Sequence, residues 1–102
     1  MKENQRILEL ATKALPEPFP EDLPENAPKP ELFEFLRKRL RYLLDHDMPG
    51  LLQSLYRMDV DEGRVKEVLA ITHPDNMSTE LTLLVWERAR QKIETRKKYR
   101  SE

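Results

Sequence analysis

Proline is unevenly distributed along this chain, because six of its eight prolines lie between Pro16 and Pro30. Each proline fixes the backbone φ angle and removes a hydrogen-bond donor, so this segment forms neither a regular helix nor a central strand. An extended, polyproline-like path is predicted for it instead. We expect Phe19 and Leu23 to anchor the segment across a helical core. The alternative is a proline-rich ligand for an aromatic groove, but a flanking basic cluster is missing.

The composition favours helices over strands. The chain has only two glycines, whereas tight β-hairpins need residues with positive φ. Its 102 residues suit one domain, and a hydrophobic content of 38%, below the roughly 45–50% of average domains, predicts a small core. Basic and acidic side chains number 18 and 19, which suits a solvated helical surface. We therefore expect a single helical domain over 1–102, with 16–30 as an internal connector.

Apolar residues recur at helical spacing in several segments of the chain. Pro30 is a favourable first residue for the second helix, and Pro49-Gly50 should end it. Asp59 and Ser78 are the expected N-caps of the last two helices. The predicted helices cover residues 4–15, from 30 to about 48, 51–56, about 60–71 and from 78 to about 98. The fold class is therefore all-α, a small bundle of four to five helices with the proline-rich segment 16–30 packed across it.

Catalytic and metal-binding patterns are not found in the sequence. The chain has no cysteine, no glycine-rich phosphate loop and no activated-serine motif. Asp45-His46-Asp47 and His73 offer possible ligands, but neither histidine has a second one four residues away. We expect no enzyme activity, no cofactor, no metal site and no small-molecule substrate.

His73-Pro74-Asp75 resembles the tripeptide between two helices in the J domain of co-chaperones, where it stimulates a partner ATPase. The sequence around it departs from that family. The preceding J-domain helix is long and basic, whereas residues 64–71 carry only Arg64 and Lys66 as positive charges. A motif needs its structural context, so a co-chaperone function is a remote alternative, and a helix stop at Pro74 is the simpler interpretation.

The C-terminal segment is strongly basic. Residues 86–102 contain seven basic and three acidic side chains, while residues 1–31 contain four basic and seven acidic ones. Such asymmetry can mark a surface that contacts nucleic-acid phosphates, although a charge run is more often a solvated helix face. The candidate nucleic-acid-binding residues are Arg88, Lys92, Arg96, Lys97 and Arg100.

Large apolar side chains near helix ends suggest a different function, which is binding to another protein or to a second copy of this chain. A chain of this size with few apolar residues can gain stability from a partner. The candidate partner-binding residues are Leu51, Leu55, Tyr56 and Trp86. Plain core packing is the alternative for all four, because most large apolar residues of a small domain are buried.

Two stretches of the second half carry a family resemblance. Leu55-Tyr56-Arg57-Met58-Asp59-Val60-Asp61, followed by Val65 and Val68, and the closing stretch from Glu87 to Tyr99 resemble small all-helical bacterial proteins to which no function has been assigned. The resemblance implies a bacterial cytosolic protein and provides no functional residues to transfer. Charges interrupt the first fifteen residues, and the longest apolar run, 81–86, is far short of the ~20 residues that span a bilayer. We expect a cytoplasmic protein without a membrane segment.

Overall fold

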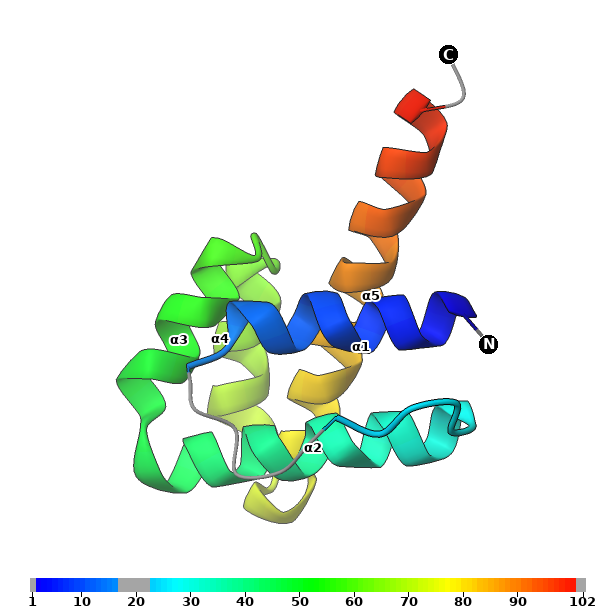
Figure 1. The fold of residues 1–102 in the computed structure, drawn as a ribbon. Coiled ribbons are helices and arrows are strands. Elements are labelled where there is room, and N and C mark those ends of the chain that lie inside the picture. Colours follow the sequence, from blue (N-terminus) through cyan, green and yellow to red (C-terminus); the bar gives the residue numbers. More distant parts are fainter. Residues whose placement is uncertain (1, 17–22, 101–102) are drawn as a thin grey trace.

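The computed structural model describes residues 2–16 and 23–100, and this part of the chain is all-helical (Figure 1). The predicted all-α fold class and the count of four to five helices are confirmed within these residues. The five helices are α1 (Lys2–Ala14), α2 (Lys29–His46), α3 (Met48–Arg57), α4 (Glu62–Ile71) and α5 (Pro74–Arg100).

The last helix organises the bundle, because α5 packs against α1, α2 and α4. Helices α1 and α2 contact each other and run in the same direction, while α3 rises and α4 descends at one end of this pair (Figure 1). The chain then turns, and α5 passes across α1 and α2. Its C-terminal turns project beyond the other helices.

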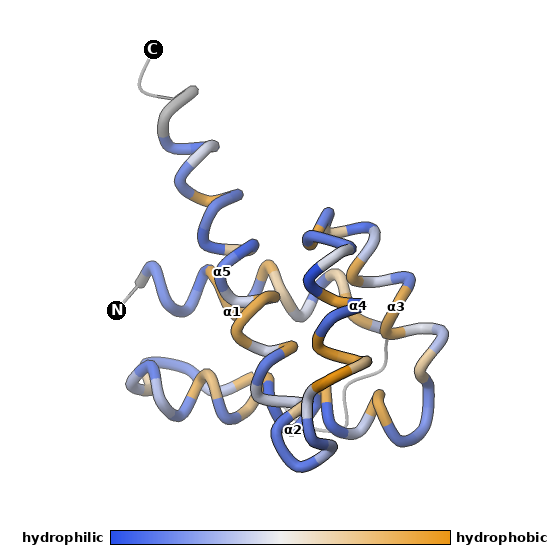
Figure 2. The backbone as a smooth tube through the Cα atoms, turned by 180° about the vertical axis from the view of Figure 1, so that it is seen from behind, coloured by the Kyte–Doolittle hydropathy of each residue, from blue (hydrophilic) through white to orange (hydrophobic). Residues whose placement is uncertain are grey.

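One cluster of buried apolar side chains joins all five helices. It forms because each helix repeats apolar residues every three or four positions and so has one apolar face. Figure 2 shows the resulting alternation of hydrophobic and hydrophilic residues, and a largely hydrophilic C-terminal part of α5. The largest apolar side chains that are almost completely buried are Ile7, Leu8, Leu32, Leu36, Leu40, Leu43, Leu51, Leu55, Leu81 and Val85.

Helix ends differ from the sequence prediction at three places. Helix α2 ends at His46, and Asp47 caps α3 by accepting a 3.1 Å hydrogen bond from the Gly50 amide. Pro49 therefore lies in the first turn of α3 and does not terminate α2.

The N-cap of α4 is Asp61, whose Oδ1 accepts hydrogen bonds from the amides of Gly63 at 2.9 Å and Arg64 at 3.3 Å. The prediction that Asp59 is this cap is wrong. Asp59 instead has left-handed backbone geometry, with φ of 64°, in the turn after α3.

Helix α5 begins at Pro74, one turn earlier than predicted, because proline suits the first helical turn. The prediction that Ser78 caps this helix is therefore wrong. Ser78 is completely buried inside α5.

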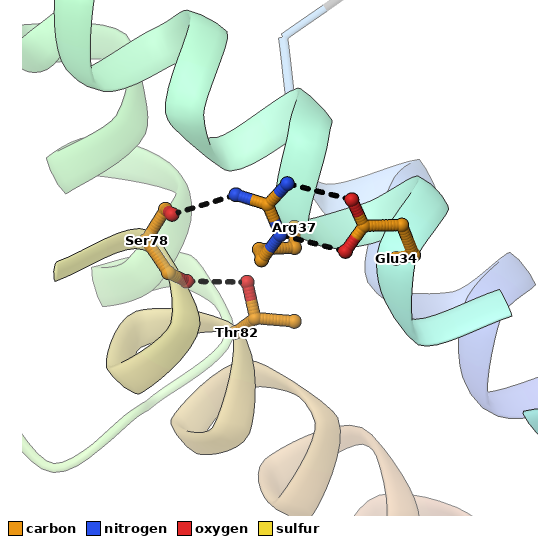
Figure 3. Close-up of polar contacts among 4 residues, drawn as sticks. All are labelled: Glu34, Arg37, Ser78 and Thr82. Carbon is orange, nitrogen blue, oxygen red and sulfur yellow. Dashed lines mark hydrogen bonds and ion pairs between the residues drawn. The ribbon is translucent and has the colours of Figure 1, made fainter. Parts of the chain in front are cut away.

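A polar contact fixes how α2 and α5 pack (Figure 3). Arg37 of α2 makes two hydrogen bonds to the Glu34 carboxylate, of 2.7 and 2.6 Å, and its third donor nitrogen reaches the Ser78 hydroxyl at 3.2 Å. Thr82, which is also completely buried, donates to the Ser78 carbonyl at 2.6 Å. The two small polar residues of α5 are thus hydrogen-bonded inside the interface, which offsets the cost of burying them.

The described part of the proline-rich segment contacts the bundle. Leu23 and Ala27 pack against the core, and the Pro24 carbonyl accepts a 2.9 Å hydrogen bond from the Gln5 side chain. Pro28 has the extended angles expected of polyproline, φ −68° and ψ 157°. Phe19 lies outside the described residues. Packing of the whole of 16–30 across the bundle therefore stays a prediction.

Candidate functional site

A cleft of about 240 Å³ lies where α5 crosses α1. Both helices present one face to it. Positions 6, 9, 10 and 13 are spaced three or four residues apart on α1, and so are positions 93, 96 and 97 on α5. We call this site the α1/α5 cleft, and its lining residues are Arg6, Glu9, Leu10, Lys13, Ile93, Arg96 and Lys97.

The α5 wall of the cleft continues the buried face of that helix. Ala89 and Ile93 are buried, and the next residues at helical spacing are Arg96 and Lys97, which are exposed. The apolar stripe of α5 thus ends at Ile93, and basic side chains take its place where the helix projects beyond the bundle (Figure 1). A continued apolar stripe would extend the core, whereas this basic continuation places exposed charged side chains beside α1.

The cleft carries excess positive charge. Lys97 forms an ion pair with Glu3, with 2.5 Å between the ammonium nitrogen and the carboxylate oxygen. The hydrogen bond and the charge of Lys97 lower the pKa of the Glu3 carboxyl below its ordinary value. Arg6, Lys13 and Arg96 form no ion pair with any residue in the described part of the chain.

The floor of the cleft is aliphatic. Ile93 is 7% exposed, and Leu10 is partly buried and packs against the core. None of the described lining residues is aromatic, so the cleft lacks a flat ring on which a nucleic-acid base can stack. The arrangement is a small apolar floor with a basic rim, which suits binding of an anionic group that carries an apolar neighbour.

The α1/α5 cleft contains two of the predicted nucleic-acid-binding residues. Arg96 and Lys97 line the α1/α5 cleft, but Lys92 and Arg88 do not. Arg88 instead connects α5 to the turn after α3, since its Nε donates to the Met58 carbonyl at 3.1 Å and its Nη2 lies 3.5 Å from the Asp59 carboxylate. The side chain of Arg100 lies outside the described residues.

The four predicted partner-binding residues occupy two different environments. Leu51, Leu55 and Trp86 are 0%, 1% and 5% exposed, as the core-packing alternative expects, whereas Tyr56 is 51% exposed. Trp86 packs between α2 and α5, with its ring 6.0 Å from that of Phe33. A partner surface made of all four residues stays a prediction, and of the four only Tyr56 has a largely exposed side chain.

Sequence reasoning missed Arg6 and Lys13, the α1 wall of the cleft. Their seven-residue spacing places both on one face of α1, which is a usable signal. The crossing of α1 over the end of α5 is a tertiary contact between segments about ninety residues apart, and no local sequence pattern predicts it.

His73-Pro74-Asp75 has a local structural role at the start of α5. The His73 Nδ1 atom accepts a 3.1 Å hydrogen bond from the Asp75 amide, so the histidine ring satisfies one of the amides that lack an intrahelical partner. All three residues are exposed. The co-chaperone interpretation of this tripeptide stays a prediction.

The three residues of Asp45-His46-Asp47 make separate contacts. Asp45 pairs with Arg41 at 3.2 Å, His46 stacks on the Tyr42 ring with 4.3 Å between centroids, and Asp47 caps α3. In the part of the chain that the structure describes, no three acidic, histidine or cysteine residues converge in a way that could hold a metal ion.

A second, wider groove of about 640 Å³ lies between the α3–α4 turn and α5. Its charged residues are largely paired, with Arg88 beside Asp59 and Glu87 hydrogen-bonded to Arg90 at 2.5 and 3.0 Å. Leu83, 50% exposed, is its most accessible apolar side chain. Its described lining carries three acidic and two basic side chains, so this groove lacks the excess positive charge of the α1/α5 cleft.

No protein-family model, curated protein or solved structure was found that matches this chain at a significant level. Among the described helices, none is both long and apolar enough to cross a membrane.

Proposed function

We propose that this protein is a small non-catalytic binding protein that docks another protein through the α1/α5 cleft. The observation that carries the proposal is the convergence of Arg6 and Lys13 from α1 with Arg96 from α5, none of which has an ion-pair partner among the described residues. Exposed cations that stabilise no internal contact are available to a partner. Charge complementarity of this kind directs association and sets specificity.

The chemistry of the cleft supports binding rather than catalysis. Arginine remains protonated throughout the physiological pH range and presents donors only, so it holds an anion without exchanging a proton. Among the described lining residues Glu9 is the single carboxylate, and no histidine, serine or cysteine accompanies it. Nucleophilic and acid–base mechanisms need such groups within hydrogen-bond reach of each other.

Co-purification of the tagged protein from its native lysate, with and without nuclease, tests the proposal. The informative variant is Arg6→Glu with Arg96→Glu, which reverses the charge on both walls of the cleft. The matched control, Lys38→Glu with Arg64→Glu, makes the same charge change at exposed positions outside the cleft.

We expect a nuclease-resistant partner that the wild-type and control proteins retain and the cleft variant loses. Equal retention by the cleft variant would contradict the proposal. A second copy of this chain, recovered as the bound protein, would identify self-association as the form that the binding takes.

Nucleic-acid binding is the second candidate, supported by the addition of Arg6 and Lys13 to the predicted Arg96 and Lys97 in one cleft. Four phosphate contacts would give an affinity that falls by about 100-fold between about 50 and 200 mM salt. Fluorescence anisotropy with labelled RNA and DNA measures this slope. If charge reversal at Lys97 and Lys98 leaves nucleic-acid binding unchanged, the basic face of α5 is excluded as the nucleic-acid-binding surface.

Bacterial origin and cytoplasmic location are further parts of the proposal, and they rest on the sequence. Fractionation of native cells followed by immunodetection of the protein tests the location. Recovery with the cytosolic fraction is expected, and recovery with any other fraction would contradict it.

A further inference from the structure

The α1/α5 cleft also indicates the chemistry of its occupant. Resting on the proposed function, we infer that the cleft receives an acidic amphipathic segment of a partner protein. Carboxylates of this segment pair with the basic rim, and one apolar side chain sits on Leu10 and Ile93.

The rim requires an anionic partner. Among the described lining residues four are cations, Arg6, Lys13, Arg96 and Lys97, and Glu9 is the only acidic one. The first three have no ion-pair partner in the described chain, so their mutual repulsion is relieved when an anion arrives.

The protein itself already pairs a carboxylate with one cation of this rim. Glu3, carried by α1, reaches across to Lys97 of α5 and forms the ion pair that lowers its pKa. A carboxylate on a helix can therefore meet the basic end of α5 in a direct contact. Further acidic residues at helical spacing on a docked segment can do the same with Arg96 and Arg6.

The size of the cleft matches an anchoring side chain. Its volume of about 240 Å³ exceeds that of an engineered cavity of about 150 Å³ that binds benzene, but lies below the roughly 300–1,000 Å³ of small-molecule pockets. One or two aliphatic side chains fit this space. The floor they would contact is the partly buried Leu10 and the 7% exposed Ile93.

These features favour a protein segment over a nucleic acid. Phosphate backbones need positive charge but gain nothing from an aliphatic floor, and bases need an aromatic platform that the described lining does not provide. An amphipathic acidic segment uses both the rim and the floor. Of the two kinds of occupant, only such a segment therefore contacts both the basic rim and the aliphatic floor of the cleft.

The test is a selection of short random peptides displayed on phage against three forms of the full chain. These are the wild type, the cleft variant Arg6→Glu with Arg96→Glu, and the control Lys38→Glu with Arg64→Glu. Circular dichroism and Trp86 fluorescence establish that each form is folded.

We expect the wild type and the control to enrich peptides that carry several acidic residues around one apolar residue. The cleft variant should lose this preference and enrich basic peptides instead. Enriched peptides without an acidic bias, an acidic bias that survives in the cleft variant, or no cleft-dependent enrichment would each overturn the inference.

Affinity measurements with the best peptide distinguish the contribution of the basic rim from that of the aliphatic floor. Replacing its apolar residue by serine should weaken binding by about tenfold or more, and raising salt from about 50 to 200 mM should weaken it further. Unchanged affinity after the serine replacement would exclude the apolar anchor. If an RNA or DNA oligonucleotide binds the cleft more tightly than every selected peptide, the occupant is a nucleic acid and the inference fails.

The outcome is distinguishable from failure of the proposed function. If the lysate partner depends on the cleft but the selected peptides show no acidic bias, the protein-docking function stands and this inference fails. If neither the lysate partner nor the peptides depend on Arg6 and Arg96, both fail.

Discussion

Asp59 is, with Asn26, one of two non-glycine residues in the described chain that have a positive φ. Its φ of 64° lies in the left-handed region, which aspartate and asparagine tolerate and β-branched residues do not. We expect Asp59→Val to lower the free energy of unfolding by about 1–2 kcal/mol, whereas Asp59→Asn should stay within about 0.5 kcal/mol of wild type. Urea unfolding monitored by circular dichroism measures both. Equal stability of the two variants would show that the turn after α3 relaxes without cost.

Asp61, two residues later, stabilises α4 by a different mechanism. Its side chain accepts hydrogen bonds from two amides at the start of the helix. Asp61→Ala should therefore lower the free energy of unfolding by about 1 kcal/mol, and Asp61→Asn, which keeps a capping oxygen, should cost much less. The midpoints of urea unfolding give the comparison. An alanine variant as stable as the asparagine variant would mean that the cap contributes nothing.

The positions of these caps show where local patterns mislead. Asp59 and Asp61 both precede an apolar stretch, and either can cap a helix. The structure selects Asp61 because Asp59 is needed with left-handed angles in the turn. Ser78 also precedes an apolar stretch, but Pro74 starts the helix earlier and Ser78 becomes an interior residue. Capping propensity thus identifies candidates, and the geometry of the preceding turn decides among them.

At the scale of elements, the contact between α2 and α5 depends on small residues in α5. Ser78 is completely buried and accepts a hydrogen bond from Arg37. Ser78→Ala should lower the free energy of unfolding by about 1 kcal/mol through the lost hydrogen bond, and Ser78→Leu should cost a further 1–3 kcal/mol, roughly, through overpacking. Fluorescence of Trp86 during urea unfolding reports this interface directly. If the leucine and alanine variants are equally stable, the interface holds unfilled space beside Ser78.

The helices themselves are readily predicted from the sequence, because apolar spacing marks their buried faces. Leu32, Leu36, Leu40 and Leu43 illustrate this on α2, where all four are fully buried. The candidate site is only half predictable. Its α5 wall belongs to a conspicuous run of basic residues, but its α1 wall becomes relevant only through a helix crossing that the local sequence does not encode.

The whole molecule should lose stability in acid. Hydrogen bonds and charges from Lys97, Arg37 and Arg90 lower the pKa values of Glu3, Glu34 and Glu87 from the ordinary 4.5. At pH values just below 4.5 the unfolded chain binds more protons than the folded protein. The stabilisation from these three carboxylates is therefore complete above pH 4.5, and it is lost as the pH falls through their lowered pKa values in the folded protein.

We therefore expect the melting temperature to fall progressively as the pH is lowered from about 5 to 3. The decrease should be smaller in Glu34→Gln, which has no carboxyl to protonate at the Arg37 contact. Calorimetry across this range measures the effect. A melting temperature that is constant or rises toward pH 3 would contradict it.

The cations of the α1/α5 cleft should contribute to binding but not to folding. Arg6 and Arg96 are exposed and have no ion-pair partner among the described residues. Each of Arg6→Glu and Arg96→Glu should therefore change the free energy of unfolding by no more than about 0.5 kcal/mol. Thermal and urea unfolding of both variants test this. A loss of several kcal/mol would show that these side chains maintain the fold.

The central position of α5 has a consequence for how the protein is made. The ribosome synthesises α1 before the other four helices and α5 after them, at about 5–20 residues per second. Helix α1 therefore waits for several seconds, and α2 and α4 for progressively shorter times, before the helix that all three pack against emerges. During that interval the nascent chain exposes apolar stripes that have only each other to contact. Completion of the core thus waits for α5, and the nascent chain is most exposed to chaperones and proteases just before this helix emerges.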